Sequence, residues 1–248
     1  MRLLRALPCL LLMIITVFGC EKESETLSVP SLTDYYPLQA GKSFTYRLDS
    51  TLYVSFGTAI KINSYLAKDS IISTFDDNLG RTSYLVYRYL SDTLQASPFI
   101  YSSSYYITPT DKTVEVTDAD NLRYIKITSP VSTTTSWNGN AYVDVSSNKT
   151  TYLNNWQYQY QNINAPFAVL AGTIDSTITV LQNDDSTLSQ PFDPYVYQSR
   201  SYSSEVYAKG IGLVYKDLLY WVYQPLGGIT PGYTAESFGI KLNLISHN

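Results

Sequence analysis

Short stretches in which apolar and polar side chains alternate recur along this chain, and they constrain its fold more than any other feature. In Ser43-Phe44-Thr45-Tyr46-Arg47-Leu48 every second side chain is apolar. Successive side chains of a β-strand point to opposite faces of a sheet, so this period of two predicts a strand with one buried and one solvated face. Few stretches beyond residue 20 have a sustained helical period, and the 24 tyrosines suit strands. We therefore expect an all-β protein.

Turn-forming residues separate the predicted strands. Asp76-Asp77-Asn78-Leu79-Gly80 and Asp118-Ala119-Asp120-Asn121 each lie between two alternating stretches, which is typical of β-hairpins. No linker divides the series, so we expect one domain over residues 34–248 with roughly ten or more antiparallel strands. A curved sheet or barrel is the expected architecture, and a β-sandwich is the alternative. The predicted strands cover residues 43–48, 51–56, 71–75, 83–90, 113–117, 122–128, 156–161, 173–181, 205–209, 211–216, 218–223 and 238–245.

The first 20 residues are typical of a lipoprotein signal peptide. Arg2 and Arg5 precede an apolar run of 12 residues from Leu7 to Phe18, shorter than the ~20 residues that a membrane-spanning helix needs. Val17-Phe18-Gly19-Cys20 resembles the lipobox of bacterial lipoproteins, although Phe18 replaces the small residue that is usual there. The resemblance implies that residues 1–19 are removed and that Cys20 is acylated. An ordinary secretory signal, in which Cys20 is incidental, is the alternative.

Residues 20–33 are expected to form a tether between the lipid and the folded domain. Glu21-Lys22-Glu23-Ser24-Glu25 is too polar to fold by itself. Several acyl chains anchor a protein stably, so we expect a membrane partner and a location in the outer membrane. Acidic residues beside a lysine after the acylated cysteine also resemble the surface-export signal of Bacteroidota lipoproteins. That resemblance implies exposure at the cell surface, and a plain solvated linker is the alternative.

Charge and cysteine content exclude several classes of protein. Without residues 1–19 the chain has 15 basic and 21 acidic residues, a net charge of −6, so it lacks the basic surface that nucleic-acid binding requires. Cys9 leaves with the signal peptide and Cys20 is the acyl acceptor, which leaves the folded domain no thiol for a disulfide or a metal. A sizeable hydrophobic core must therefore hold the 229 remaining residues together.

Several distinctive motifs are spread along the chain after the signal peptide. They are Tyr35-Tyr36-Pro37-Leu38 followed by Gly41-Lys42-Ser43-Phe44 and Tyr46, Asp120-Asn121-Leu122-Arg123-Tyr124 to Pro130, Trp137-Asn138-Gly139-Asn140, Tyr207-Ala208-Lys209-Gly210-Ile211-Gly212-Leu213-Val214-Tyr215-Lys216, and the terminal His247-Asn248. Together these motifs resemble an uncharacterised family of Bacteroidota lipoproteins, and the similarity covers nearly the whole chain after the signal peptide. The resemblance implies a lipoprotein with a single domain, and no activity is attached to it.

Residues suited to catalysis or metal binding are sparse. His247 is the only histidine and lies beside the last residue, where it is poorly placed to act as a held base or a zinc ligand. Gly210-Ile211-Gly212 lacks the third glycine of a phosphate loop and is better explained as a bend in a strand. Glu115, Glu205 and Glu236 are the only glutamates beyond the tether, and turn aspartates usually cap their own backbone. We expect no metal, no cofactor and no catalytic residue.

Clusters of tyrosine and tryptophan are the one candidate for a binding surface. Trp156, Tyr158 and Tyr160 would share one face of a predicted strand. Flat rings with polar tips suit sugar binding, so these three form a candidate aromatic binding face. Large aromatic side chains fill cores more often than they form platforms, and we favour a core position for them.

A sequence pattern for covalent modification is also present. Asp followed by Ser or Thr and then a small, aliphatic or Thr residue resembles the O-glycosylation sequon of Bacteroidota periplasmic proteins. Composition alone would produce about one match, so the five matches are an excess, although Asp-Ser is also common in turns. The candidate acceptors are Ser50, Ser70, Thr93, Ser176 and Ser186.

Three functions are consistent with these features. The favoured one is a non-enzymatic binding or structural protein anchored in the cell envelope, with a glycan or an envelope protein as its partner. The second is an envelope glycan hydrolase that uses an Asp/Glu pair about 5 to 9.5 Å apart in a cleft. The third is a carrier of lipid or another apolar ligand, which requires an open barrel with an apolar cavity.

The anchor is directly testable. We predict that Cys20→Ala releases the protein from membranes, because the acyl acceptor is lost. Fractionation of cells into membrane and soluble pools measures this, with the wild-type protein as the control. Unchanged retention of the variant in membranes would contradict the lipid anchor.

Overall fold

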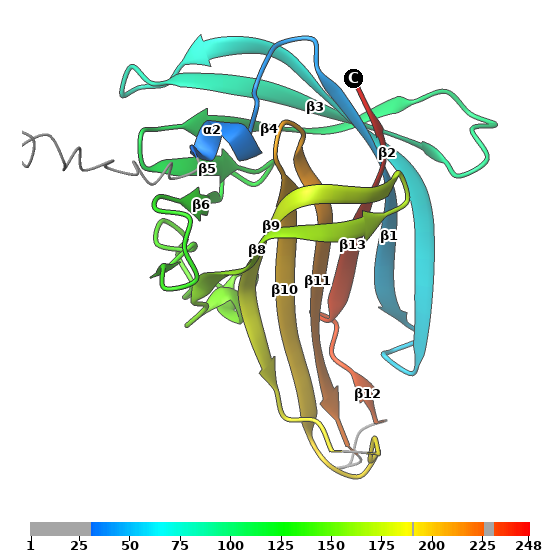
Figure 1. Cartoon of the computed structure of the whole chain (residues 1–248). Helices are drawn as coiled ribbons and strands as arrows, with labels where there is room; N and C mark the ends of the chain where they lie inside the picture. The colour runs from blue at the N-terminus through cyan, green and yellow to red at the C-terminus, as the bar shows by residue number, and fades with distance from the viewer. Residues whose placement is uncertain (1–30, 190, 226–230) are drawn as a thin grey trace, which may run out of the picture.

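The computed structural model describes residues 31–189, 191–225 and 231–248. In this part of the chain 13 antiparallel strands form one sheet, which curves into a nearly closed barrel (Figure 1). The predicted all-β class and barrel-like sheet are confirmed. The elements are α2 (Leu32–Tyr35), β1 (Ser43–Val54), β2 (Ala59–Asp76), β3 (Thr82–Asp92), β4 (Ile100–Pro109), β5 (Thr113–Thr117), β6 (Arg123–Thr128), β7 (Ser136–Trp137), the 3-10 helix η1 (Thr151–Leu153), β8 (Tyr158–Val169), β9 (Gly172–Ser186), β10 (Gln198–Ala208), β11 (Gly212–Gln224), β12 (Gly232–Tyr233) and β13 (Phe238–His247).

The order of the strands explains how the barrel forms. They lie in the order β6-β5-β4-β3-β2-β1-β13-β11-β10-β9-β8-β7, and β12 pairs with β11. Two meanders therefore meet where β1 pairs with β13, and β6 and β7 are the free ends of the sheet. The ends approach each other because the backbone N–H of Ile125 donates to Gly139 at 2.8 Å and the Trp137 indole donates to Ile125 at 2.9 Å.

Several predicted strands are longer than the sequence pattern indicated. The two strands predicted at residues 43–48 and 51–56 form the single strand β1, which ends at Val54. Those predicted at residues 211–216 and 218–223 form β11, which begins at Gly212. Asp217 does not interrupt β11, because it forms an ion pair with Lys241 on the adjacent β13. We predicted no strand for β4, since its serines hide the alternation.

The folded domain begins slightly before residue 34. Leu32 was assigned to the tether, but it lies in α2 and is 5% exposed. Ser31 precedes this turn of helix and accepts a hydrogen bond from the Thr33 backbone N–H at 3.3 Å. The predicted signal peptide and Cys20 lie outside the described residues.

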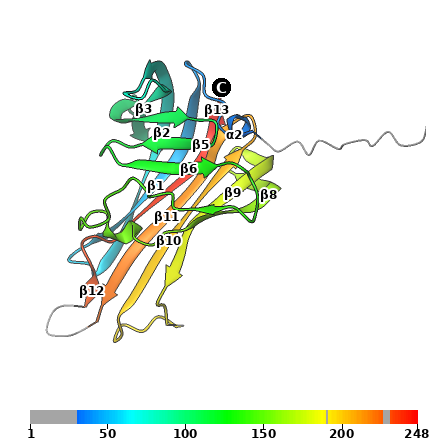
Figure 2. The same cartoon turned by 90° about the vertical axis from the view of Figure 1, so that its left-hand side faces the viewer.

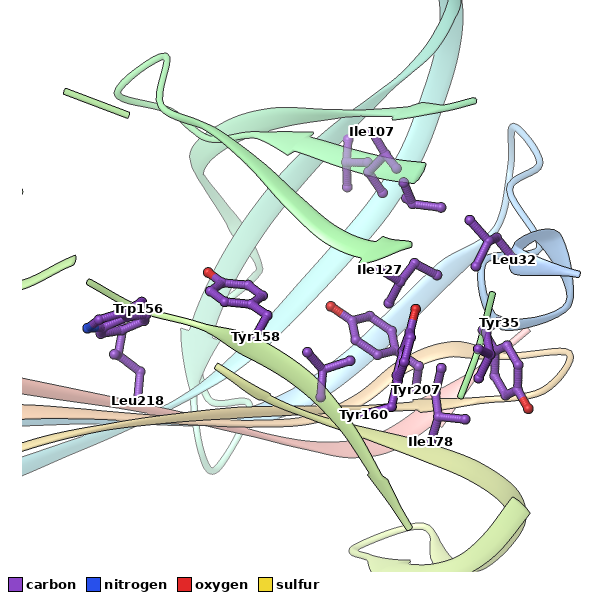
Figure 3. Packing of buried hydrophobic residues seen from close by; sticks show 14 of the residues in the cluster. Leu32, Tyr35, Ile107, Ile127, Trp156, Tyr158, Tyr160, Ile178, Tyr207 and Leu218 are labelled. Atoms are coloured by element: carbon purple, nitrogen blue, oxygen red, sulfur yellow. The ribbon is translucent and has the colours of Figure 1, made fainter. Parts of the chain in front are cut away.

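The main core lies between the β4–β6 strands and the strands β8 to β11. Figure 2 shows β5 and β6 running across the direction of the long strands. Ile107 and Ile127 come from the first layer, and Tyr160, Ile178 and Tyr207 come from the second (Figure 3). All five are at most 5% exposed. This layer of apolar side chains holds the short strands over the long ones.

The end of the β8–β9 hairpin covers the other face of the long strands. It bends at irregular positions where Asn162, Asn164 and Ser176 have positive φ, a conformation that Asn tolerates better than most residues. At its tip the Ala171 N–H donates to the carbonyl of Leu244 at 2.9 Å. Val206, Ala208 and Val214 are consequently buried in a second apolar cluster with Phe167 and Val169.

Tyr160 is a specific test of barrel closure. Its hydroxyl accepts from the Thr128 N–H at 2.8 Å and donates to the Thr128 carbonyl at 2.5 Å. We predict that Tyr160→Phe lowers the free energy of unfolding by about 1–3 kcal/mol, because two backbone groups lose their partner. Urea denaturation measures the change. Tyr202→Phe is the matched control, since among the described residues that hydroxyl bonds only to the side chain of Ser204. An equal effect of both variants would contradict the role of Tyr160.

Candidate functional site

A cavity of about 360 Å³ lies inside the barrel. Its volume is within the usual range for small-molecule sites, roughly 300–1,000 Å³. Apolar side chains from strands of both meanders line much of this cavity, including Phe44 of β1, Val86 of β3 and Leu218 of β11. Ala119 and Asp120 are the exposed residues of the lining, so the cavity reaches the surface at the β5–β6 turn.

Glu205 of β10 is the centre of a buried charged network in this cavity. Its Oε1 lies 2.9 Å from Nζ of Lys126 on β6 and 3.3 Å from Nζ of Lys216 on β11. Gln182 on β9 donates to Oε2 at 2.8 Å, and the Tyr207 hydroxyl donates to the same oxygen. The Glu205 side chain is only 2% exposed. Four strands therefore place donors around one interior carboxylate.

The surrounding cations keep Glu205 ionised. Burial by itself would raise the pKa of Glu205, but Lys126, Lys216 and the hydrogen bond from Tyr207 overcome this and lower it to about 2. Burial and the charge of Glu205 both raise the pKa of the Tyr207 hydroxyl, which therefore remains a donor. The general acid of a glycoside hydrolase needs a raised pKa, and Glu205 does not fit that role.

A second buried ion pair joins β2 and β3 at the cavity wall. Arg88 donates to Asp69 from Nε at 2.7 Å and from Nη2 at 2.6 Å, and the Tyr105 hydroxyl donates to Asp69 at 2.9 Å. Burial would lower the pKa of Arg88, but the charge of Asp69 raises it. Bidentate pairs of this geometry are stronger than single hydrogen bonds.

The candidate aromatic binding face lies inside the protein. Trp156, Tyr158 and Tyr160 are 5%, 1% and 2% exposed, which matches the core position that we favoured (Figure 3). Trp156 and Tyr158 also line the cavity. The indole Nε1 of Trp156 is buried and has no hydrogen-bond partner among the described residues.

The candidate glycosylation residues differ in accessibility. Thr93, Ser176 and Ser186 are exposed, whereas Ser50 and Ser70 are half-buried within strands. Near Thr93, the carboxylate of Asp92 accepts hydrogen bonds from three backbone amides, as expected for a turn aspartate. Ser70 follows the buried Asp69. Exposure therefore favours Thr93, Ser176 and Ser186 as acceptors, and modification at all five stays a prediction.

Turn aspartates act as caps, as the sequence indicated. Asp77 accepts from the N–H groups of Leu79 and Arg81, and Asp118 accepts from those of Asp120 and Leu122.

Within residues 31–189, 191–225 and 231–248 no three His, Cys, Asp or Glu side chains gather as a metal site. In the same part of the chain no helix is long and apolar enough to cross a membrane. No protein-family model, curated protein or solved structure matches this chain.

Sequence reasoning missed most of the polar groups in the cavity. Glu205 was noted only as one of three glutamates beyond the tether, and the cavity lysines and Arg88 were not singled out. A weak signal does exist, because Glu205 is the only charged residue in the stretch 201–208 and shares a face with Ser203 and Tyr207. Such a carboxylate requires cationic partners, but the alternation pattern does not reveal which strands supply them.

We predict that Glu205→Gln destabilises the protein by about 3–5 kcal/mol, because it leaves buried lysines without their countercharge. The folded-state pKa is lowered, so the carboxylate stabilises the protein above its ordinary value of 4.5 and loses this effect as the pH falls toward about 2. The stability difference between wild type and variant should therefore shrink over that window in urea denaturation series.

Glu236→Gln is the matched control, because Glu236 is exposed and forms no ion pair within the described residues. It should change stability by less than about 0.5 kcal/mol. A Glu205→Gln effect as small as this, or one independent of pH between 4.5 and 2, would contradict the assigned network.

Proposed function

We propose that this protein is a lipid-anchored envelope lipoprotein that binds a small, largely apolar molecule inside its barrel, without catalysing a reaction. The observation that carries the proposal is the interior cavity, with apolar side chains along its walls and an outlet at the β5–β6 turn. The proposed cellular location rests on residues 1–20, where the signal pattern and Cys20 support attachment to the outer membrane. The resemblance to Bacteroidota lipoproteins supports the same location.

Carriage of an apolar ligand is now favoured over the other two functions. An exposed aromatic platform would have favoured glycan capture at the surface, but the rings of Trp156, Tyr158 and Tyr160 are buried. A hydrolase needs a proton donor and a second carboxylate in the cleft. Glu205 is ionised and already surrounded by hydrogen-bond donors, so it does not fit the role of proton donor. Asp118 caps its own turn and Asp120 is exposed, so neither fits the role of second carboxylate.

Binding in the cavity can be measured with a neutral apolar fluorophore, N-phenyl-1-naphthylamine. The protein sample is the chain from residue 20 with Cys20→Ala, made without signal peptide and lipid, so that no detergent competes for the dye. We predict saturable binding of one dye molecule per chain. Ser103→Trp should weaken it at least tenfold, because Ser103 lines the cavity directly opposite Arg88 of β3 and a large ring there would occupy the space.

Ser73→Trp is the matched control, since Ser73 is exposed on β2 and is not part of the cavity lining. This variant should bind the dye as the wild type does. Circular dichroism checks that both variants keep their β structure. No saturable binding by the wild-type sequence, or equal binding by Ser103→Trp, would contradict a ligand cavity.

A further inference from the structure

We propose that the ligand is an apolar molecule with one carboxylate group, and that this group binds in the cavity beside Lys216 and Arg88. This inference rests on the proposed function, because it specifies the ligand of the same cavity. It follows from a surplus of cationic donors at the cavity wall.

The charges around the cavity do not balance. Arg88, Lys126 and Lys216 line it and carry three positive charges. Their buried partners are two carboxylates, since Asp69 pairs with Arg88 and Glu205 pairs with both lysines. These ion-paired groups therefore have one positive charge in excess, apart from Asp118 and Asp120 of the lining, which lie in the β5–β6 turn. A monovalent anion would neutralise it, whereas a cationic ligand would increase the imbalance.

Hydrogen-bonding capacity points the same way. The two oxygens of Glu205 face four donors, and those of Asp69 accept three hydrogen bonds. By contrast, an ammonium group has three N–H donors and a guanidinium has five. Lys126 makes one hydrogen bond and Arg88 makes two within the described residues, and Lys216 has Glu205 as its only ion-pair partner there. The remaining capacity consists of donors, which suit an anionic acceptor.

The three cations repel one another, and this repulsion lowers the pKa of Lys216. Burial lowers the pKa of Lys216, and the charges of Lys126 and Arg88 lower it further, while Glu205 opposes them. Its side chain keeps 23% exposure although it lines the cavity. A carboxylate placed there would relieve the repulsion between the three cations.

The rest of the cavity suits the apolar part of such a molecule. Ile71, Val86, Ile107 and Leu242 are all buried and line the wall. Two further carboxylates, Asp118 and Asp120, lie at the outlet rather than beside the lysines. Asp118 caps the β5–β6 turn, and Asp120 is exposed, where solvent screens its charge.

The test compares ligands that differ only in the charge of one end. Decanoate, decanol and decylamine are used at pH 7.5 to displace N-phenyl-1-naphthylamine from the lipid-free chain. We predict that decanoate binds at least tenfold more tightly than decanol, and that decylamine binds more weakly than decanol. Equal displacement by decanoate and decanol, or a preference for decylamine, would overturn the carboxylate assignment while leaving the proposed function intact.

A matched pair of lysine variants locates the carboxylate. Lys216→Met removes the charge at similar side-chain length, and Lys126 remains to pair with Glu205, so the fold should persist. The ratio of decanoate affinity to decanol affinity should fall at least tenfold in Lys216→Met and stay unchanged in Lys61→Met, because Lys61 is exposed on β2.

Lys216→Arg keeps the charge and should retain most of the preference for decanoate. An unchanged ratio in Lys216→Met would overturn the placement of the carboxylate. If the wild-type sequence binds no dye at all, the proposed function fails and this inference fails with it. The wild-type comparison needs no substitution, so it decides the preference even if Lys216→Met does not fold.

Discussion

The ion pair between Glu205 and Lys126 is the interaction on which the arrangement of this barrel depends. Glu205 lies on β10 and Lys126 on β6, strands that are far apart in the order of the sheet. An unpaired carboxylate in the interior is strongly disfavoured, so the strands β4 to β6 must lie where Lys126 can reach it. Lys216, Gln182 and Tyr207 complete the set from β11, β9 and β10. The network therefore couples the registers of four strands to the closure of the barrel.

This network also explains why the interior retains a cavity. Apolar side chains alone would pack to the density of a normal core. Charged groups remain only where they keep hydrogen-bond partners, and their spacing limits how closely the two layers approach. Ile127 and Ile178 are fully buried and are not part of the cavity lining, whereas Glu205 and Lys216 line the open space. Structure and proposed ligand binding thus depend on the same residues.

Tyrosine fits this architecture for a physical reason. Its ring fills the apolar layers, and its hydroxyl satisfies polar groups that a strand cannot pair. Tyr46 donates to the carbonyl of Leu213 at 2.9 Å, and Tyr158 donates to the side chain of Asn140 at 2.9 Å. Tyr105 and Tyr207 donate to the buried carboxylates of Asp69 and Glu205 respectively. A curved sheet whose ends do not pair fully needs side chains of this kind.

The sequence by itself determined the all-β class, the hairpins around Asp76–Gly80 and Asp118–Asn121, and the capping roles of the turn aspartates, because these depend on contacts within a few residues. Only the tertiary structure decided which strands pair at β1 and β13, and that Trp156, Tyr158 and Tyr160 are buried. It also decided that Glu205, Lys126 and Lys216 meet. Alternation shows which side chains share a face of one strand, but not which distant strand lies opposite that face. The candidate site depends on that second kind of contact, between residues 79 positions apart in the case of Lys126 and Glu205.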